Sequence, residues 1–351
     1  MRPSRVRLLL AIAGVYFSSS IVSSALAWDA HGHRTITRLA IDGFVASAGA
    51  AAPLPDWLTT ESARAQIAYQ SSEADRYRGT RSNYLGHENN PDHFLDVEDL
   101  ATFGLTLSTM PPLRYQYVAA MAVARHVHPD GHKPHNPRLN PTGDQEWPGF
   151  VAHAIAEHHA KLTSAFKSVR TLETLNDPAR AHQLDMARAN VLVHMGHLSH
   201  FVGDSAQPLH TTRHHHGWVG DNPNGYTTDR GIHAFIDGTI LTIHGLSYDS
   251  LKEEARFETK VDAGDPWRDI LSYIQRSHDL VEPLYMLHKS GQLTQDPGKP
   301  FIAERLLDAS SMLAALYTSA WNASTPTDKD VKDFVFYDSP AKAQPAPGMG
   351  K

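Results

Sequence analysis

Histidine and aspartate residues of this chain recur at spacings that suit a metal ion. In the segment HLSHFVGDSAQPLH, His200 and Asp204 are four residues apart, so on a helix they would share one face, with Cβ atoms about 6 Å apart. His210 follows after a proline and would return from a loop, which gives the ligands a second backbone direction. A polar pair in so apolar a segment would be costly to bury without partners. The spacing therefore predicts a metal site.

A second pair repeats this geometry. In GIHAFIDG, His233 and Asp237 are again four residues apart and are surrounded by apolar side chains. Alone, the pair is as readily explained by chance as by metal binding. Beside the first pair it indicates a site with more than one metal ion.

Two upstream segments add further candidates. SEADRYRG places Asp75 three residues before Arg78, and PDHFLDVEDL contains His93, Phe94 and Asp96. An isolated aspartate is more often a solvated charge, and an isolated histidine is more often a surface or capping residue. These residues gain meaning only together with the downstream pairs.

The composition limits what kind of site can form. The chain has 23 histidines and no cysteine, so it forms no disulfide and any metal must be bound by His, Asp and Glu. Imidazole ligands suit zinc. Histidines outside the pairs, including His214–His216, lie mostly in polar segments and are expected to be solvated.

The N-terminus is typical of a secretory signal. Basic residues precede an apolar stretch, and Ala25-Leu26-Ala27 fits a cleavage site. The apolar run is shorter than the roughly 20 residues that a membrane anchor needs. We expect cleavage between Ala27 and Trp28 and a secreted or periplasmic protein. Removal of three arginines and no acid changes the formal charge from −6 to −9, which argues against a broad basic groove for nucleic acid.

The elements that must position these residues are predicted to be helices. We expect one all-α domain over residues 28–337 and a disordered tail over residues 338–351. Apolar periodicity and capping residues favour helices over 34–45, 60–70, 112–123, 147–169, 177–203, 231–244, 267–288 and 303–321. Gly203 and Pro208 are expected to end the fifth of these, and residues 334–337 are the one candidate strand.

Together these segments carry a family resemblance. Trp28 with His33, and the segments ADRYR, HFLDVED, HFVGDSAQPLH and HAFID, resemble the trinuclear zinc phosphoesterases. This superfamily contains secreted single-strand-specific nucleases of fungi and plants and bacterial zinc-dependent phospholipases C. The motifs follow the family's order from Trp28 to Asp237. The resemblance implies an all-α fold that binds three Zn²⁺ ions in a cleft.

The resemblance also implies a role for each candidate residue. The first zinc ion would take Asp75, His93, His200 and Asp204. The second would take His210, His233 and Asp237. The third would take the amino nitrogen and carbonyl oxygen of Trp28, with His33 and a shared Asp204. Arg78 would stabilise the transition state, Asp75 would also orient the nucleophile, and Phe94 and Asp96 would meet a base.

Such a site suits phosphodiester hydrolysis. Two zinc ions roughly 3.5–4 Å apart can hold a bridging hydroxide near neutral pH, and a third can take charge developing on the leaving oxygen. Asp237 and HFLDVED resemble the nuclease branch. We therefore expect a nuclease that prefers single-stranded DNA or RNA and can also act on 3′-nucleotides, with no stable protein partner. A phospholipase C and a non-catalytic zinc-binding protein remain the alternatives.

Overall fold

The computed structural model describes residues 28–48, 54–80, 82–132 and 147–338. The expected signal segment and the tail from residue 339 onwards lie outside the described residues. The helices of the described part are α1 (Ala30–Ala48), α2 (Asp56–Thr59), α3 (Glu61–Gln70), α4 (Glu73–Gly79), α5 (Asn83–Asn89), α6 (Arg114–Val127), α7 (Val151–Leu175), α8 (Ala181–Ala206), α9 (Ile232–Ala234), α10 (Ile240–His244), α11 (Tyr248–Leu251), α12 (Trp267–His278), α13 (Val281–Lys289), α14 (Gly298–Ala323) and α15 (Asp328–Tyr337).

The fold is all-α, as predicted. Within the described ranges the only β-type pairing is an isolated antiparallel bridge between Leu95 and Gly149. Shorter 3₁₀ helices connect the longer ones, among them η1 (Asn90–His93), η2 (Val97–Phe103) and η7 (Pro208–His210). None of the described helices is both long enough and apolar enough to cross a membrane.

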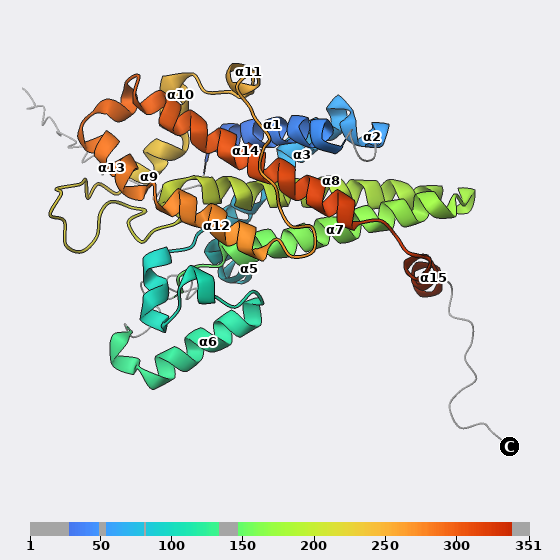
Figure 1. The fold of residues 1–351 in the computed structure, drawn as a ribbon, viewed down its shortest axis with the longest axis horizontal. Helices are drawn as coiled ribbons and strands as arrows, with labels where there is room; N and C mark the ends of the chain where they lie inside the picture. The colour runs from blue at the N-terminus through green and yellow to red at the C-terminus, as the bar shows by residue number, and fades with distance from the viewer. Residues whose placement is uncertain (1–27, 49–53, 81, 133–146, 339–351) are drawn as a thin grey trace, which may run out of the picture.

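Four long helices form the centre of the molecule. Figure 1 shows α1, α7, α8 and α14 running side by side, and these helices pack directly on one another. Their facing sides supply fully buried side chains such as Ile36, Phe166, Leu198 and Leu313, which belong to one continuous apolar core. Burial of this surface is the main stabilising term for such a bundle. The segment from η2 to α6 projects from one side of it.

The helix boundaries follow the local chemistry closely at some ends. The Thr60 side chain caps α3 by accepting a hydrogen bond from the amide nitrogen of Ala63 at 3.1 Å, as a helix-capping threonine is expected to do. The π-helical turn η8 (Phe235–Thr239) interrupts the helix predicted over 231–244. Such turns arise where a helix accommodates an extra residue, often at functional sites.

Three sequence predictions about elements are wrong. Residues 334–337 lie in helix α15 and form no strand, because Thr327 caps a helix that continues through them. Gly203 does not end α8, which continues to Ala206. The helix predicted over 267–288 is two helices, α12 and α13.

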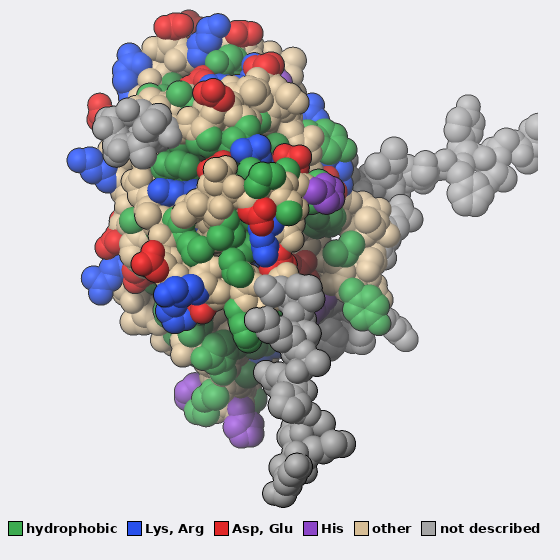
Figure 2. Space-filling model, turned by 90° about the vertical axis from the view of Figure 1, so that its right-hand side faces the viewer, with side chains coloured by type: hydrophobic (Ala, Val, Ile, Leu, Met, Phe, Trp, Pro, Cys, Tyr) green, Lys and Arg blue, Asp and Glu red, His purple; other side chains and the backbone are tan. Residues whose placement is uncertain are grey.

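On the surface at the end of the molecule where α15 lies, neither acidic nor basic side chains predominate. Figure 2 shows acidic and basic side chains interspersed with scattered hydrophobic ones on this face. Scattered apolar side chains are normal on a globular protein. The concentration of chemically active residues lies elsewhere, at the ends of helices that meet beside α8.

Candidate metal centre

The first group of metal-binding side chains lies where α8 meets η1. His200 and Asp204 project from adjacent turns of α8, as predicted, and His93 reaches them from the end of η1. The Nδ1 atom of His93 lies 3.0 Å from the Nε2 atom of His200 and 3.0 Å from the Oδ2 atom of Asp204. All three side chains are buried. Their ligand atoms converge closely enough to hold one metal ion.

The backbone around His93 is fixed by a close approach between two chain segments. Leu95 forms the isolated bridge with Gly149, and a Cβ atom at Gly149 would lie 2.1 Å from the carbonyl oxygen of Phe94. Gly149 also has a φ angle of 110°, which side chains disfavour. Only glycine therefore lets these segments meet and hold His93 beside α8.

The hydrogen bonds of His200 leave one nitrogen free to bind a metal. Its Nδ1 atom donates to the carbonyl oxygen of Ser71 at 2.7 Å, because a carbonyl can only accept. Nε2, which faces His93 and Asp204, then carries the lone pair of the neutral ring. Burial lowers the pKa of His200 to about 3, so the ring stays neutral at physiological pH. Anchoring of the outer nitrogen by a carbonyl is usual for histidine ligands of metals.

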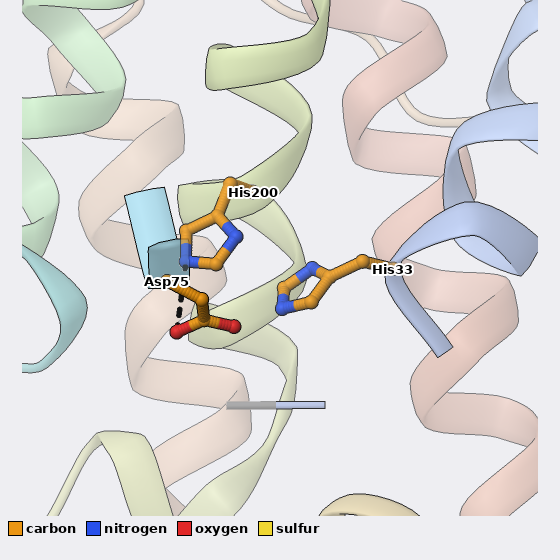
Figure 3. Close-up of side chains that lie close together, drawn as sticks. All are labelled: His33, Asp75 and His200. Carbon is orange, nitrogen blue, oxygen red and sulfur yellow. Dashed lines mark ion pairs between the residues drawn. The ribbon is translucent and has the colours of Figure 1, made fainter. Parts of the chain in front are cut away.

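A second group overlaps the first and includes the N-terminal helix. Figure 3 shows His33 of α1, Asp75 of α4 and His200 of α8 directed toward a common space. The Oδ1 atom of Asp75 lies 3.9 Å from the Nε2 atom of His200, and the imidazole of His33 stacks on that of His200 with ring centroids 4.2 Å apart. The Nε2 atom of His33 lies 3.3 Å from Asp204. This group can also hold a metal ion.

The third group lies between η7 and the π-helical turn. The Nε2 atoms of His210 and His233 are 2.9 Å apart, and the Nε2 atom of His233 lies 3.4 Å from the Oδ2 atom of Asp237. His210 donates its Nδ1 hydrogen to the carbonyl oxygen of His93 at 2.6 Å, which ties this group to the first. The three residues can together hold a metal ion.

Gln207 orients the carboxylate of Asp237 through a hydrogen bond. The Gln207 side chain accepts a hydrogen bond from the amide of Leu209 and donates one to the Oδ1 atom of Asp237 at 2.9 Å. The Oδ2 atom of Asp237 is buried and has no hydrogen-bond partner among the described residues. That oxygen is the one directed at His233.

The electrostatics of the three groups call for a cation. Burial raises the pKa values of Asp204 and Asp237 well above the usual range and lowers those of His33 and His233 well below it. Within the described part of the chain, several of their buried atoms meet no hydrogen-bond partner: both ring nitrogens of His33, Asp75 Oδ1, Asp204 Oδ1 and Asp237 Oδ2. Buried polar atoms without partners are costly, and a divalent ion would satisfy them together. These residues fit a metal centre.

A cleft opens over the centre. It has a volume of about 710 Å³, and His93, His210 and His233 reach it from the metal-binding groups. Arg78 also lines it, with its guanidinium 3.8 Å from the Oδ1 atom of Asp75. Phe94 and Trp147 provide aromatic rings in its wall. The metal-binding groups thus border a space that a small ligand can enter.

The structure brings together all eight side chains that were predicted to bind metal. The ninth predicted ligand, Trp28, would bind through its backbone. The indole of Trp28 is fully buried and donates its Nε1 hydrogen to the carbonyl oxygen of Gly203 at 3.0 Å. This contact fixes the segment before His33 against α8. The ligand role expected for the Trp28 backbone stays a prediction.

The two residues predicted to meet substrate, Phe94 and Asp96, both line the cleft. Asp96 is buried, and its Oδ1 atom lies 3.7 Å from the Nδ1 atom of His215. Burial raises the pKa of Asp96, and this nearby carboxyl raises the pKa of His215 against the effect of burial. Asp96 and His215 therefore form a titratable pair at the wall of the cleft.

Sequence reasoning missed the histidines that follow His210. It treated His214–His216 as solvated loop residues, but His215 and His216 line the cleft and the His214 ring stacks on Trp218 at 3.9 Å. Their position just after a predicted ligand was the available signal. Gln207 and Arg230 were also missed, because a lone amide or arginine has no recognisable spacing.

Comparison with models of known protein families gave no match, and comparison with curated protein sequences gave none either. The chemistry of the centre therefore rests on its own geometry.

Proposed function

We propose that this protein is a zinc-dependent phosphodiesterase that cleaves single-stranded nucleic acid. The observation that carries the proposal is the convergence of eight His and Asp side chains, seven of them buried, beside a cleft that Arg78 also lines. Imidazole and carboxylate ligands without cysteine suit zinc, and three neighbouring groups, two of which share His200, suit up to three ions. Bound zinc would supply charge neutralisation and activation of water at this position.

The residues of the chain itself would bind and orient the substrate. The guanidinium of Arg78 can donate planar, paired hydrogen bonds to phosphoryl oxygens and counter charge that develops in the transition state. Asp75 lies between Arg78 and the two histidines of the first group, which places a carboxylate where it can orient an attacking water. His93 and His200 remain neutral through burial and so remain ligands at neutral pH.

The cleft wall favours a nucleic acid over a phospholipid. Phe94 and Trp147 offer rings on which an unpaired base can stack, and such stacking is worth about 1–3 kcal/mol per base. Asp96 supplies a buried acceptor beside them, which suits the amino groups of a base. A duplex would hide those faces, so the wall favours single strands.

The test compares substrates with the purified protein beginning at Trp28. Metal content is measured first, followed by hydrolysis of bis(4-nitrophenyl) phosphate, single-stranded DNA and RNA, and phosphatidylcholine micelles. We expect zinc, diester hydrolysis and cleavage of single strands. Turnover of the lipid without turnover of nucleic acid would replace the proposal by a phospholipase C, and bound zinc without any hydrolysis would replace it by a zinc-binding protein.

A further inference from the structure

Two arginines stand at the ends of the loop 211–230 and line the cleft beyond the metal centre. The guanidinium of Arg213 lies 3.0 Å from the carboxylate of Asp99, so its charge is already balanced. Arg230 also lines the cleft, and no carboxylate of the described residues forms an ion pair with it. An unbalanced arginine in a cleft attracts an anion from solution.

His216 lines the cleft together with Arg230 and offers a second group that can bind an anion. Its ring lies 5.2 Å from that of His233, measured between centroids, and its Nδ1 atom is buried without a hydrogen-bond partner among the described residues. An imidazole ring carries an N–H that can be donated to an anionic oxygen.

We infer that Arg230 and His216 form a subsite for a second phosphate group of a polynucleotide, next to the phosphate held over the metal centre. The inference rests on the proposed function and specifies its substrate: a chain with at least two consecutive phosphates. Arg78 lies beside Asp75 of the second group, whereas His216 lies beside His233 of the third. Arg78 and the proposed subsite therefore face different parts of the metal centre.

The chemistry of the subsite is that of phosphate recognition. Arginine provides paired donors in a plane that matches two phosphate oxygens, and the imidazole N–H of His216 adds a third donor. Arg213 contributes less, because binding an anion there would compete with Asp99. A cleft of about 710 Å³ has room for more than a single phosphate group.

The experiment compares a dinucleotide, which has one phosphodiester, with a trinucleotide, which has two. The variant is Arg230→Gln, and the control is Arg268→Gln, an exposed arginine at the start of α12 outside the cleft. We expect kcat/KM of Arg230→Gln to fall about tenfold for the trinucleotide and to stay unchanged for the dinucleotide and for bis(4-nitrophenyl) phosphate. For Arg230→Gln, the slope of the logarithm of the trinucleotide binding constant against the logarithm of salt concentration should decrease by about one. Arg268→Gln should match the wild type in all these measurements.

The outcomes separate the subsite from the function. An equal loss on both substrates, or no loss on either, overturns the subsite. A wild-type protein that hydrolyses all diesters with no advantage for the trinucleotide also overturns the subsite while leaving the proposed function intact. A wild-type protein that contains zinc but hydrolyses none of them overturns the proposed function and the subsite with it.

Discussion

The Nε2 atoms of His210 and His233 lie 2.9 Å apart, and the hydrogen bond from His210 to the His93 carbonyl leaves a lone pair on the Nε2 atom of His210. The two nitrogens can stay so close only if His233 donates a hydrogen or a cation lies between them. Asp237 adds a carboxylate oxygen without a hydrogen-bond partner at the same point. Two ring nitrogens and one carboxylate oxygen, each with a lone pair to share, are directed at one point, and this arrangement favours the cation.

Removal of metal is therefore expected to destabilise the folded protein. Metal that binds the folded state at 100 to 1,000 times its dissociation constant adds about 2.7–4.1 kcal/mol to the free energy of unfolding. Treatment with a chelator should lower Tm by on the order of 5–15 °C. Differential scanning fluorimetry before and after addition of zinc measures this, and an unchanged Tm would argue against a structural role for the ions.

A matched pair of histidine variants locates the effect. His233→Asn should reduce the zinc content and make Tm less sensitive to chelator, because it removes a nitrogen from the third group. His126→Asn changes an exposed histidine of α6 and should leave both quantities unchanged. Equal behaviour of the two variants would contradict the assignment of the third group.

A second prediction concerns the contact between α8 and α1. A Cβ atom at Gly203 would lie 2.9 Å from the Nδ1 atom of His33, so Gly203→Ala must displace that ring. Overpacking of this kind costs about 1–3 kcal/mol, and we expect lower zinc affinity besides lower stability. Gly131→Ala is the control, since nothing lies within 4 Å of its Cβ position. Isothermal titration with zinc and urea unfolding measure the two effects separately.

Gly203 also shows what the sequence could and could not predict. The four-residue spacing of His200 and Asp204 correctly predicted two side chains on one helix face. The same reading placed the helix end at Gly203, because glycine is a weak helix former. The glycine instead permits the close packing of His33, a tertiary reason that no local pattern reveals.

The cleft was harder to predict than the metal centre. Residue type and spacing point to five candidate ligands, His200, Asp204, His210, His233 and Asp237. Only the family resemblance points to His33, Asp75 and His93. Residues of the cleft wall such as Trp147 and His216 lie far apart in the sequence and are brought together only by the fold. The alternating pattern over 334–337 does not predict a strand correctly, because the cap at Thr327 begins a helix that includes these residues.

A third prediction concerns Arg114, which joins three segments. Its guanidinium donates to both carboxylate oxygens of Asp92, which precedes His93, and to Glu157 of α7 at 2.8 and 2.9 Å. Arg114→Met would leave the buried carboxylate of Asp92 unpaired, which costs about 3 kcal/mol. We expect lower stability and weaker zinc binding, since η1 would lose its anchor.

The double variant Arg114→Met with Asp92→Asn provides the control. It removes the unpaired charge, so urea unfolding should show part of the lost stability restored. Destabilisation equal to or greater than that of Arg114→Met alone would show that the pair does not act through this charge.

A fourth prediction concerns acid sensitivity, and it arises from buried histidines outside the centre. His153 donates its Nε2 hydrogen to the carbonyl oxygen of Pro111 at 2.9 Å, and burial lowers its pKa from 6.5 to about 4. The unfolded chain takes up a proton near pH 6.5 and the folded chain only near pH 4. Stability is therefore complete above pH 6.5 and falls between pH 6.5 and 4, by up to about 1.4 kcal/mol per pH unit.

The variant His153→Gln removes this titration while keeping an amide donor. Its free energy of unfolding, measured in urea at pH 7.0, 5.5 and 4.5, should fall less steeply with acid than that of the wild type. The absolute stability at pH 7.0 is expected to drop because the ring stacks on Tyr117. A slope identical to that of the wild type would refute the burial effect.

The last prediction separates two roles of Trp28. The indole packs in the core and donates to the Gly203 carbonyl, so Trp28→Phe removes a buried hydrogen bond and should cost about 2 kcal/mol of stability.

The amino nitrogen expected after cleavage is a separate group with an ordinary pKa of about 8, which can lose its proton when it binds a metal ion. One Met added before Trp28 converts that nitrogen into an amide and leaves the indole in place. We expect Trp28→Phe to keep its zinc with a lower Tm, and the extended chain to keep the indole contact but to lose one zinc ion and activity. Metal analysis and Tm on both proteins decide the matter, and full zinc content and rate in the extended chain would show that the indole alone matters.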